Sequence, residues 1–211
     1  MTEVVFILDR SGSMCGLEQD TIGGFNSMLE KQKKEAGAAF VSTVLFDDKT
    51  DVIHDRIPIE SVPKLTEKDY YVRGCTALLD AVGGTIKHIK NIHKYARKED
   101  VPAKTLFVIT TDGMENASHT YSYDAVKKMI EHQKEHHGWE FMFLGANIDA
   151  IAEAGRLGIE EEMAANFVCD KVGMATNFDA LSDAVLCARE CSSVMGSNWK
   201  EKIDADFEER G

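Results

Sequence analysis

Short apolar runs alternate along this sequence with longer amphipathic stretches, and that alternation limits the possible folds more than any other feature. About four to eight consecutive apolar residues suit a strand that is buried on both faces. Such runs occupy residues 4–8, 39–46, 52–57, 105–111 and 139–144, and a shorter one lies at Phe167 and Val168. The stretches between them have the periodicity of helices. This order predicts an α/β fold, a doubly wound, mostly parallel six-stranded sheet with helices on both faces.

One pair of predicted strands is joined too closely to be parallel. Only the polar turn at residues 47–50 separates the run at 39–46 from the run at 52–57, whereas parallel strands need a crossover of roughly a dozen residues or more. We therefore predict one antiparallel edge strand. The main helices are predicted from residues that recur along one face, at Ile22, Phe25, Met28 and Leu29, at Leu79, Val82, Ile86 and Ile89, at Val126, Met129, Ile130 and Gln133, and at Phe178, Leu181 and Val185.

The length of 211 residues fits one large α/β domain. We assign residues 1–199 to this single domain and expect the charged residues 200–211 to form a frayed tail. The sequence has no signal peptide pattern and no apolar run near the roughly 18 residues that would span a bilayer. Five cysteines without paired spacing suit reduced thiols. These features predict a cytoplasmic protein without a membrane anchor.

The net charge of −12 argues against nucleic acid and anionic lipid as partners, because both attract a clustered positive surface. The locally basic stretch 87–98 is interpreted as the solvated face of a helix. His132, His136 and His137 are interpreted in the same way, as a solvated helix end, since neither a zincin pattern nor nearby cysteines accompany them.

Small polar residues follow two of the predicted strands and open one helix. Asp9, Ser11 and Ser13 come directly after the first strand, Thr76 opens the long helix, and Asp112 ends the strand at 105–111. In an open α/β sheet, loops at the carboxyl ends of the strands converge on a ligand crevice. Hydroxyl and carboxylate oxygens are the ligands of a hard cation. We therefore predict a Mg²⁺ site at these five residues, with Mn²⁺ or Ca²⁺ as alternatives.

The Asp-x-Ser-x-Ser pattern at residues 9–13, with Thr76 and Asp112, resembles the metal-ion-dependent adhesion site (MIDAS) of the von Willebrand factor A (vWA) domain family, which has a Rossmann-like fold. The stretch Gly145 to Asp149 adds a weaker similarity to small stand-alone bacterial or phage members. The resemblance implies that the serines and the threonine contact the metal directly or through water and that the aspartates lie mainly behind them. It also implies a non-enzymatic module whose metal binds a Glu or Asp side chain of a partner, here an intracellular protein.

Two other functions remain open. A magnesium-dependent phosphoryl hydrolase could use Asp9 as its nucleophile, although Ser11 stands where such enzymes place a second acid. A structural subunit could carry the site as a vestige. Asp9, Thr76 and Asp112 could also serve only as turn or helix-capping residues. The roles of Glu115, Cys15 and Cys75, and the oligomeric state, are not predicted.

Overall fold

The computed structural model describes residues 1–190 and 193–211. Six strands form one sheet in the order β3-β2-β1-β4-β5-β6, and every neighbouring pair except β2–β3 is parallel. This confirms the predicted fold class. The strands are β1 Thr2–Asp9, β2 Ala39–Phe46, β3 Thr50–Pro58, β4 Lys104–Thr111, β5 Glu140–Gly145 and β6 Ala164–Asn166.

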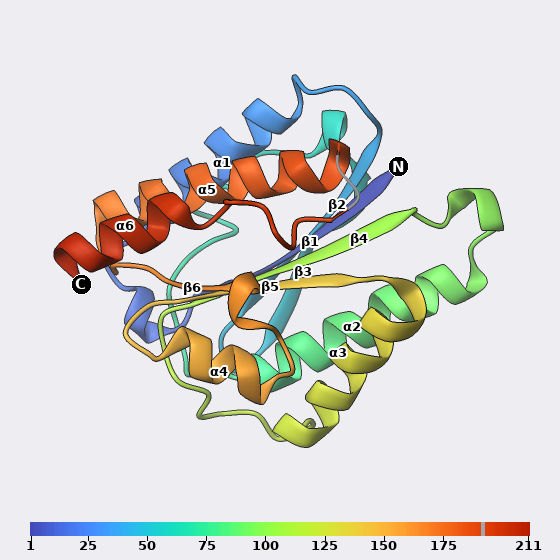
Figure 1. Cartoon of the computed structure of the whole chain (residues 1–211). Helices are drawn as coiled ribbons and strands as arrows, with labels where there is room; N and C mark the ends of the chain where they lie inside the picture. Colours follow the sequence, from blue (N-terminus) through green and yellow to red (C-terminus); the bar gives the residue numbers. More distant parts are fainter. Residues whose placement is uncertain (191–192) are drawn as a thin grey trace.

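Helices cover both faces of the sheet (Figure 1). One layer contains α1, α5 and α6, and the other contains α2, α3 and α4, as Figure 1 shows above and below the sheet. The helices are α1 Glu18–Gln32, α2 Leu78–Tyr95, α3 Tyr123–His137, α4 Ala150–Arg156, α5 Lys171–Glu190 and α6 Glu201–Arg210. Among the helices of the described ranges, none combines the length and the apolar character that crossing a bilayer requires.

The central strand β1 lies between two helical layers, which explains its unbroken apolar run. Each residue from Val4 to Leu8 is at most 1% exposed. Phe6 packs edge-on against Phe25 of α1, with ring centroids 5.2 Å apart. Full burial of a side chain of this kind stabilises a fold by about 1.5–3 kcal/mol, so the central strand is anchored firmly and holds the residues at its end in place.

The antiparallel edge strand is confirmed. β3 pairs with β2 in antiparallel register, with Phe46 opposite Thr50 and Val41 opposite Ile57. The register shifts on both sides of Thr43, which marks a bulge or irregularity in the ladder. β3 is longer than the predicted 52–57 because the turn residue Thr50 already pairs.

The sequence-based predictions were wrong at two places near the carboxyl terminus. The sixth strand is Ala164–Asn166 and not Phe167 and Val168. Residues 201–210 form helix α6, where we expected a frayed tail, and Ile203 of this helix is 1% exposed. A single buried apolar residue in a highly charged segment gives too weak a periodic signal to predict a packed helix. The domain limit at residue 199 stays a prediction.

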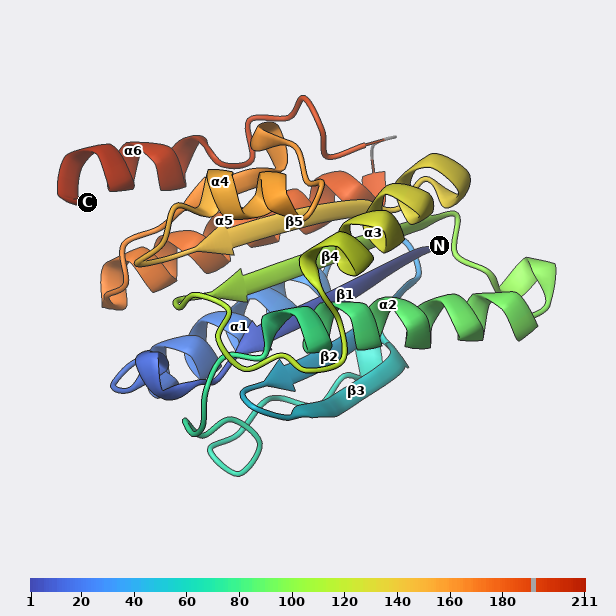
Figure 2. The same cartoon turned by 90° about the horizontal axis from the view of Figure 1, so that it is seen from below.

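The parallel strands all end at the same edge of the sheet, which Figure 2 shows by the arrowheads of β4 and β5. At this carboxyl edge lie the segment after β1, the segment before α2 and the segment after β4. The fold therefore brings together the three segments that contain the predicted site residues.

Candidate metal site

Three hydroxyl groups from two distant segments meet at the carboxyl edge. The Thr76 hydroxyl donates a hydrogen bond to Ser11 Oγ at 3.0 Å, and Ser11 Oγ lies 3.1 Å from Ser13 Oγ. The Ser13 hydroxyl in turn donates to Asp112 Oδ1. Four of the five predicted residues thus form one chain of oxygen atoms, which crosses from the first loop to α2 and β4.

Asp9 lies behind this chain. Its Oδ1 accepts a hydrogen bond from the Ser11 amide at 2.7 Å, and its Oδ2 accepts one from the Thr111 hydroxyl at 2.6 Å. With both oxygens engaged and the residue only 2% exposed, Asp9 orients the loop and does not reach outward. Sequence reasoning missed Thr111, and the only available signal was its place directly before Asp112.

A buried cluster of charges joins the loops around the site, and no sequence pattern predicted it. Arg10 is 1% exposed, and its Nε donates to Asp47 Oδ2 at 2.8 Å. Arg73 Nε donates to the same oxygen at 2.7 Å, and both guanidinium groups also contact Asp51. Burial alone would raise the pKa of Asp47, but the bonds from Arg73, Lys49 and Arg10 lower it. The cluster fixes the end of β1 against the segment before α2.

Backbone contacts hold the same two segments together. The Gly12 amide donates to the Gly74 carbonyl at 3.2 Å, and the buried Tyr70 hydroxyl donates to the Asp9 carbonyl at 2.6 Å. Gly74 has φ +67°, and a Cβ there would lie 2.1 Å from Asp48 Oδ1. Only glycine fits this turn without displacing a neighbour.

Gly113 lets the backbone after β4 approach the hydroxyl groups closely. A Cβ on Gly113 would lie 3.3 Å from both Ser13 Oγ and Thr76 Oγ1, so it would fill space at the centre of the site. Asn116 secures the approach, because its Oδ1 accepts from the Thr76 amide at 2.9 Å and its own amide donates to the Thr76 carbonyl at 3.0 Å.

Glu115 turns away from the hydroxyl groups. Its Oε2 accepts from the Leu79 amide in the first turn of α2 at 2.9 Å, and its Oε1 accepts from the amides of Ala117 and Ser118 at 2.9 and 2.7 Å. The carboxylate therefore caps α2 and orders the following loop. It is bound within the chain and does not compete for the site.

The cysteines around the site have different environments. Cys15 and Cys75 are exposed, whereas Cys169, which sequence reasoning did not single out, donates its thiol to Asp112 Oδ2 at 3.7 Å. Burial, helped by the charge of Asp112, raises the pKa of Cys169 to about 11. A hard cation prefers oxygen to sulfur, so oxygen atoms remain the fitting donors.

The site contains two buried carboxyl groups, Asp9 and Asp112. Burial raises the pKa of Asp9 above its ordinary value, and it does the same for Asp112. A cation nearby would favour the charged carboxylates. Within the described residues, no three His, Cys, Asp or Glu side chains gather where they could hold a metal, so an ion here would depend on hydroxyl oxygens together with these acids. That donor set fits a hard divalent cation.

The order of the strands and the polar loops at their carboxyl edge define an open, doubly wound α/β domain with a ligand edge of the Rossmann-like kind. No known family model and no curated protein matches the sequence. Solved structures do match. The vWF domain of the type V pili tip protein Mfa5 from Porphyromonas gingivalis is similar at a TM-score of 0.59 and 12% identity, covering 91% of this chain and 97% of that one.

A D319A mutant of the PilB minor pilin from Streptococcus sanguinis is similar at a TM-score of 0.60 and 12% identity, over 88% of this chain and 61% of that one. Proximal thread matrix protein 1 from the mussel byssus, with a zinc-occupied MIDAS motif, is similar at 0.58 and 13% identity, over 88% and 46%. The match covers 46% of the chain in another crystal form of the byssus protein and 42% of the chain of a von Willebrand factor type A structure from Catenulispora acidiphila. This chain thus spans about half the length of several matched chains.

These similarities confirm that the chain is a vWA-like domain in its fold. At identities this low they carry no information on the site itself. Metal binding by Asp9, Ser11, Ser13, Thr76 and Asp112 therefore stays a prediction, supported by the way the side chains come together.

Proposed function

We propose that this domain binds a partner protein through a divalent metal ion, Mg²⁺ or alternatively Mn²⁺ or Ca²⁺, held at the carboxyl edge of the sheet. One observation carries the proposal: hydroxyls from Ser11, Ser13 and Thr76 and the carboxylate of Asp112 form a continuous set of oxygens from three segments. An isolated turn or helix cap would not require groups so distant in sequence to meet.

The residues divide into ligands and supports. Ser11, Ser13 and Thr76 would hold the ion, while Asp9 and Asp112 would stabilise it from behind through their hydrogen bonds to the serines. With mostly neutral direct ligands, the bound ion keeps much of its positive charge and attracts a carboxylate. A Glu or Asp side chain of the partner is the group we expect there.

The surface around the site suits a protein partner. Ser13 is exposed, and Met114, next to Gly113, is 68% exposed, so an apolar contact is available beside the polar centre. Methionine is one of the residue types enriched at protein interfaces. Exposed thiols at Cys15 and Cys75 suit a reducing compartment, and the proposal therefore includes a cytoplasmic location and an intracellular partner.

The hydrolase alternative fits this geometry poorly. A nucleophilic aspartate must direct one oxygen at its substrate, but both oxygens of Asp9 accept hydrogen bonds from Ser11 and Thr111. Ser11 offers no carboxyl group as a general acid. We therefore propose binding and not catalysis as the function of the site.

Calorimetric titration of chelator-treated protein with MnCl₂ and MgCl₂ tests the metal site. We expect saturable binding to wild type, and a decrease of about 10–100-fold or more in affinity for Asp9→Ala and Ser13→Ala. Ser27→Ala, an exposed serine of α1 away from the site, is the matched control. Unchanged affinity in both site variants would contradict the proposal.

Partner binding needs its own measurement. Peptides selected from a displayed library in Mn²⁺ should contain a required Glu or Asp, and replacing it by Gln or Asn should abolish binding. Chelator and Ser13→Ala should release the same peptides, while Ser27→Ala should not. Retention in chelator, with Ser13→Ala also unaffected, would support the structural-subunit alternative instead.

A further inference from the structure

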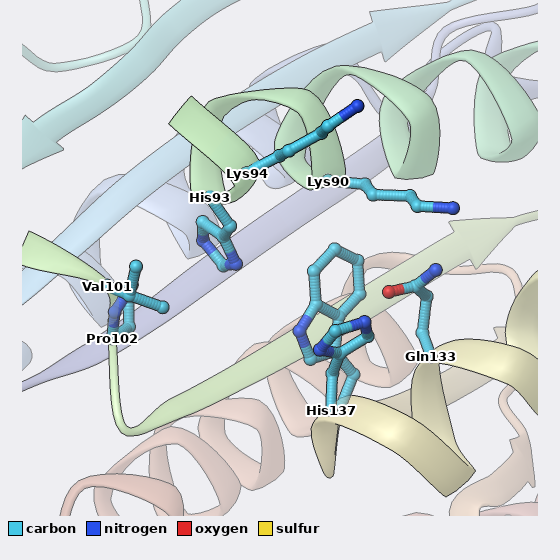
Figure 3. Close-up of a pocket in the computed structure, with 8 residues that line it drawn as sticks. Lys90, His93, Lys94, Val101, Pro102, Gln133 and His137 are labelled. Atoms are coloured by element: carbon cyan, nitrogen blue, oxygen red, sulfur yellow. The ribbon is translucent and has the colours of Figure 1, made fainter. Parts of the chain in front are cut away.

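A cavity lies at the opposite edge of the sheet from the metal site, between the ends of α2 and α3 (Figure 3). Its volume is about 280 Å³. Figure 3 shows Lys90, His93 and Lys94 on α2 and Gln133 and His137 on α3, and Trp139 before β5 also lines it. This volume is close to the lower limit for small-molecule sites, about 300 Å³, and therefore suits one compact ligand.

Gln133 gives the cavity an unsatisfied hydrogen-bond acceptor. The residue is 1% exposed, and within the described part of the chain its Oε1 has no hydrogen-bond partner. A buried polar atom without a partner has lost its hydrogen bonds to water and gained none in return, which destabilises the fold. A ligand that donates an N–H or O–H to this oxygen would remove that destabilisation.

Trp139 supplies a rigid aromatic surface. Its indole stacks on Phe107 with ring centroids 5.2 Å apart, and the His93 ring meets it edge-on at 5.4 Å. Both contacts fix the orientation of the indole, which is 5% exposed. Aromatic side chains held in this way favour planar rings as ligands.

The cavity is locally positive although the whole chain carries a charge of −12. Lys90 and Lys94 form no ion pair within residues 1–190 and 193–211. The buried acid beside His93 is Glu3, whose oxygens have Arg56 Nε at 2.9 Å and His93 Nε2 at 2.5 Å. Lys94 Nζ lies over the Tyr95 ring, 5.3 Å from its centroid. Neither lysine has an acidic partner among the described residues, so both attract an anion.

The pKa of His137 is lowered by its surroundings in the cavity. Burial lowers it most, and electrostatic repulsion from His132, His136, Lys90 and His93 lowers it further. A neutral imidazole at neutral pH leaves His137 able to accept or donate a hydrogen bond at the mouth of the cavity.

From these observations we infer that the cavity between α2 and α3 binds a compact, planar aromatic anion that also carries an N–H or O–H donor. The ring lies against Trp139, the donor reaches Gln133 Oε1, and the anionic group lies near Lys90 and Lys94. The inference is independent of the metal site, which involves none of these residues.

The probe for this site is 4-aminobenzoate, which has the ring, the anionic group and the donor. Trp139 and Trp199 are the two tryptophans, so the Trp199→Phe variant assigns the Trp139 indole N–H signal in a ¹H–¹⁵N spectrum. We expect that signal to shift saturably on addition of 4-aminobenzoate. Metal affinity measured in the same samples should not change.

Variants and ligand analogues separate the two polar interactions. Lys90→Ala combined with Lys94→Ala should weaken 4-aminobenzoate about three- to tenfold but leave its neutral methyl ester unchanged. Gln133→Met should weaken 4-aminobenzoate about three- to tenfold but leave benzoate, which lacks the donor, unchanged. Lys87→Ala, an exposed lysine of α2 outside the cavity, is the matched charge control.

Three results would overturn the inference. The first is the absence of a saturable shift of the Trp139 signal. The second is that the double lysine variant weakens binding of 4-aminobenzoate and of its methyl ester equally. The third is that Lys87→Ala weakens 4-aminobenzoate binding as much as the double variant does. Binding only to acidic peptides and not to 4-aminobenzoate would equally reject the small-ligand assignment, in favour of a protein side chain as occupant.

Discussion

Neighbouring threonines at the end of β4 have contrasting environments. The Thr111 hydroxyl donates to Asp9 Oδ2 at 2.6 Å, whereas the Thr110 hydroxyl is buried and has no partner among the described residues. The Thr111 hydroxyl therefore orients an acid of the proposed metal site. The Thr110 hydroxyl has lost its contact with water without gaining a hydrogen bond, which is destabilising.

Replacing each threonine by valine should give opposite results. Thr111→Val removes the support of Asp9, and we expect metal affinity to fall about 10–100-fold. Thr110→Val should leave affinity unchanged and raise the free energy of unfolding by about 1 kcal/mol. Calorimetric titration and urea denaturation measure the two effects. Equal metal affinities in the two variants would refute the role given to Thr111.

His54 makes stability depend on pH. It is 2% exposed, with its Nδ1 2.9 Å from Thr43 Oγ1, and burial lowers its pKa below the ordinary value of 6.5. The unfolded chain therefore binds the proton more tightly than the folded chain does. The contribution of neutral His54 to the free energy of unfolding is complete above pH 6.5 and is lost as the pH falls through the folded pKa.

His54→Gln removes the titrating group but keeps a polar side chain beside Thr43. We expect wild type to lose stability relative to this variant as the pH is lowered from 7 through 6.5 toward the folded pKa. Denaturation curves at successive pH values give the difference. A difference that does not change with pH would show that His54 is not buried in its neutral form.

Helix α2 contains two adjacent glycines with different surroundings. A Cβ on Gly84 meets no atom within 4 Å, whereas a Cβ on Gly83 would lie 2.7 Å from the Tyr121 ring. Gly83 permits the close approach of the loop before α3, and Gly84 only adds flexibility to the helix.

Alanine at the two positions should separate these roles. Gly84→Ala should stabilise the protein by about 0.5–1 kcal/mol through helix propensity. Gly83→Ala should be destabilising by roughly 1–3 kcal/mol, since Tyr121 must move. Thermal and urea unfolding of both variants provide the measurement. A stabilised Gly83→Ala would mean that the loop is not packed on α2.

The elements themselves could be predicted because their signals are local. The run from Val4 to Leu8 and the periodic face of α2 lie within single segments, and their order alone gave the fold class. The site residues could be proposed because Asp9, Thr76 and Asp112 each stand at the end of such a segment.

Contacts that join distant segments could not be predicted in this way. The Arg10–Asp47–Arg73 cluster, the bond from Thr111 to Asp9 and the helix cap by Glu115 each depend on side chains that meet only after the sheet has formed. Their residue types are common on any surface. Nothing in their spacing distinguishes them from solvated charges.

Helix α6 completes the layer over α5. Ile203 is 1% exposed, Lys202 contacts Asp179 and Asp183 of α5 at 2.8 and 3.0 Å, and Arg210 contacts Asp170 at 2.6 Å. The exposed ion pairs contribute little each, so Ile203 is the main attachment.

Ile203→Ala should therefore lower the free energy of unfolding by about 2–4 kcal/mol. Glu209→Ala, an exposed position of the same helix, is the control and should change stability by less than about 0.5 kcal/mol. Urea denaturation of both variants checks the difference. Similar small effects would support the frayed tail that the sequence suggested.

The two borders of the sheet are both unsuited to accepting another strand. β3 has a shifted register and exposed charged residues such as Asp55, and β6 has only three residues, with α6 lying next to it. Irregular, charged or very short edge strands discourage β-augmentation and fibre growth. Any companion molecule must therefore recognise this domain through side chains and loops, and a strand-mimicking peptide should be a poor inhibitor of its associations.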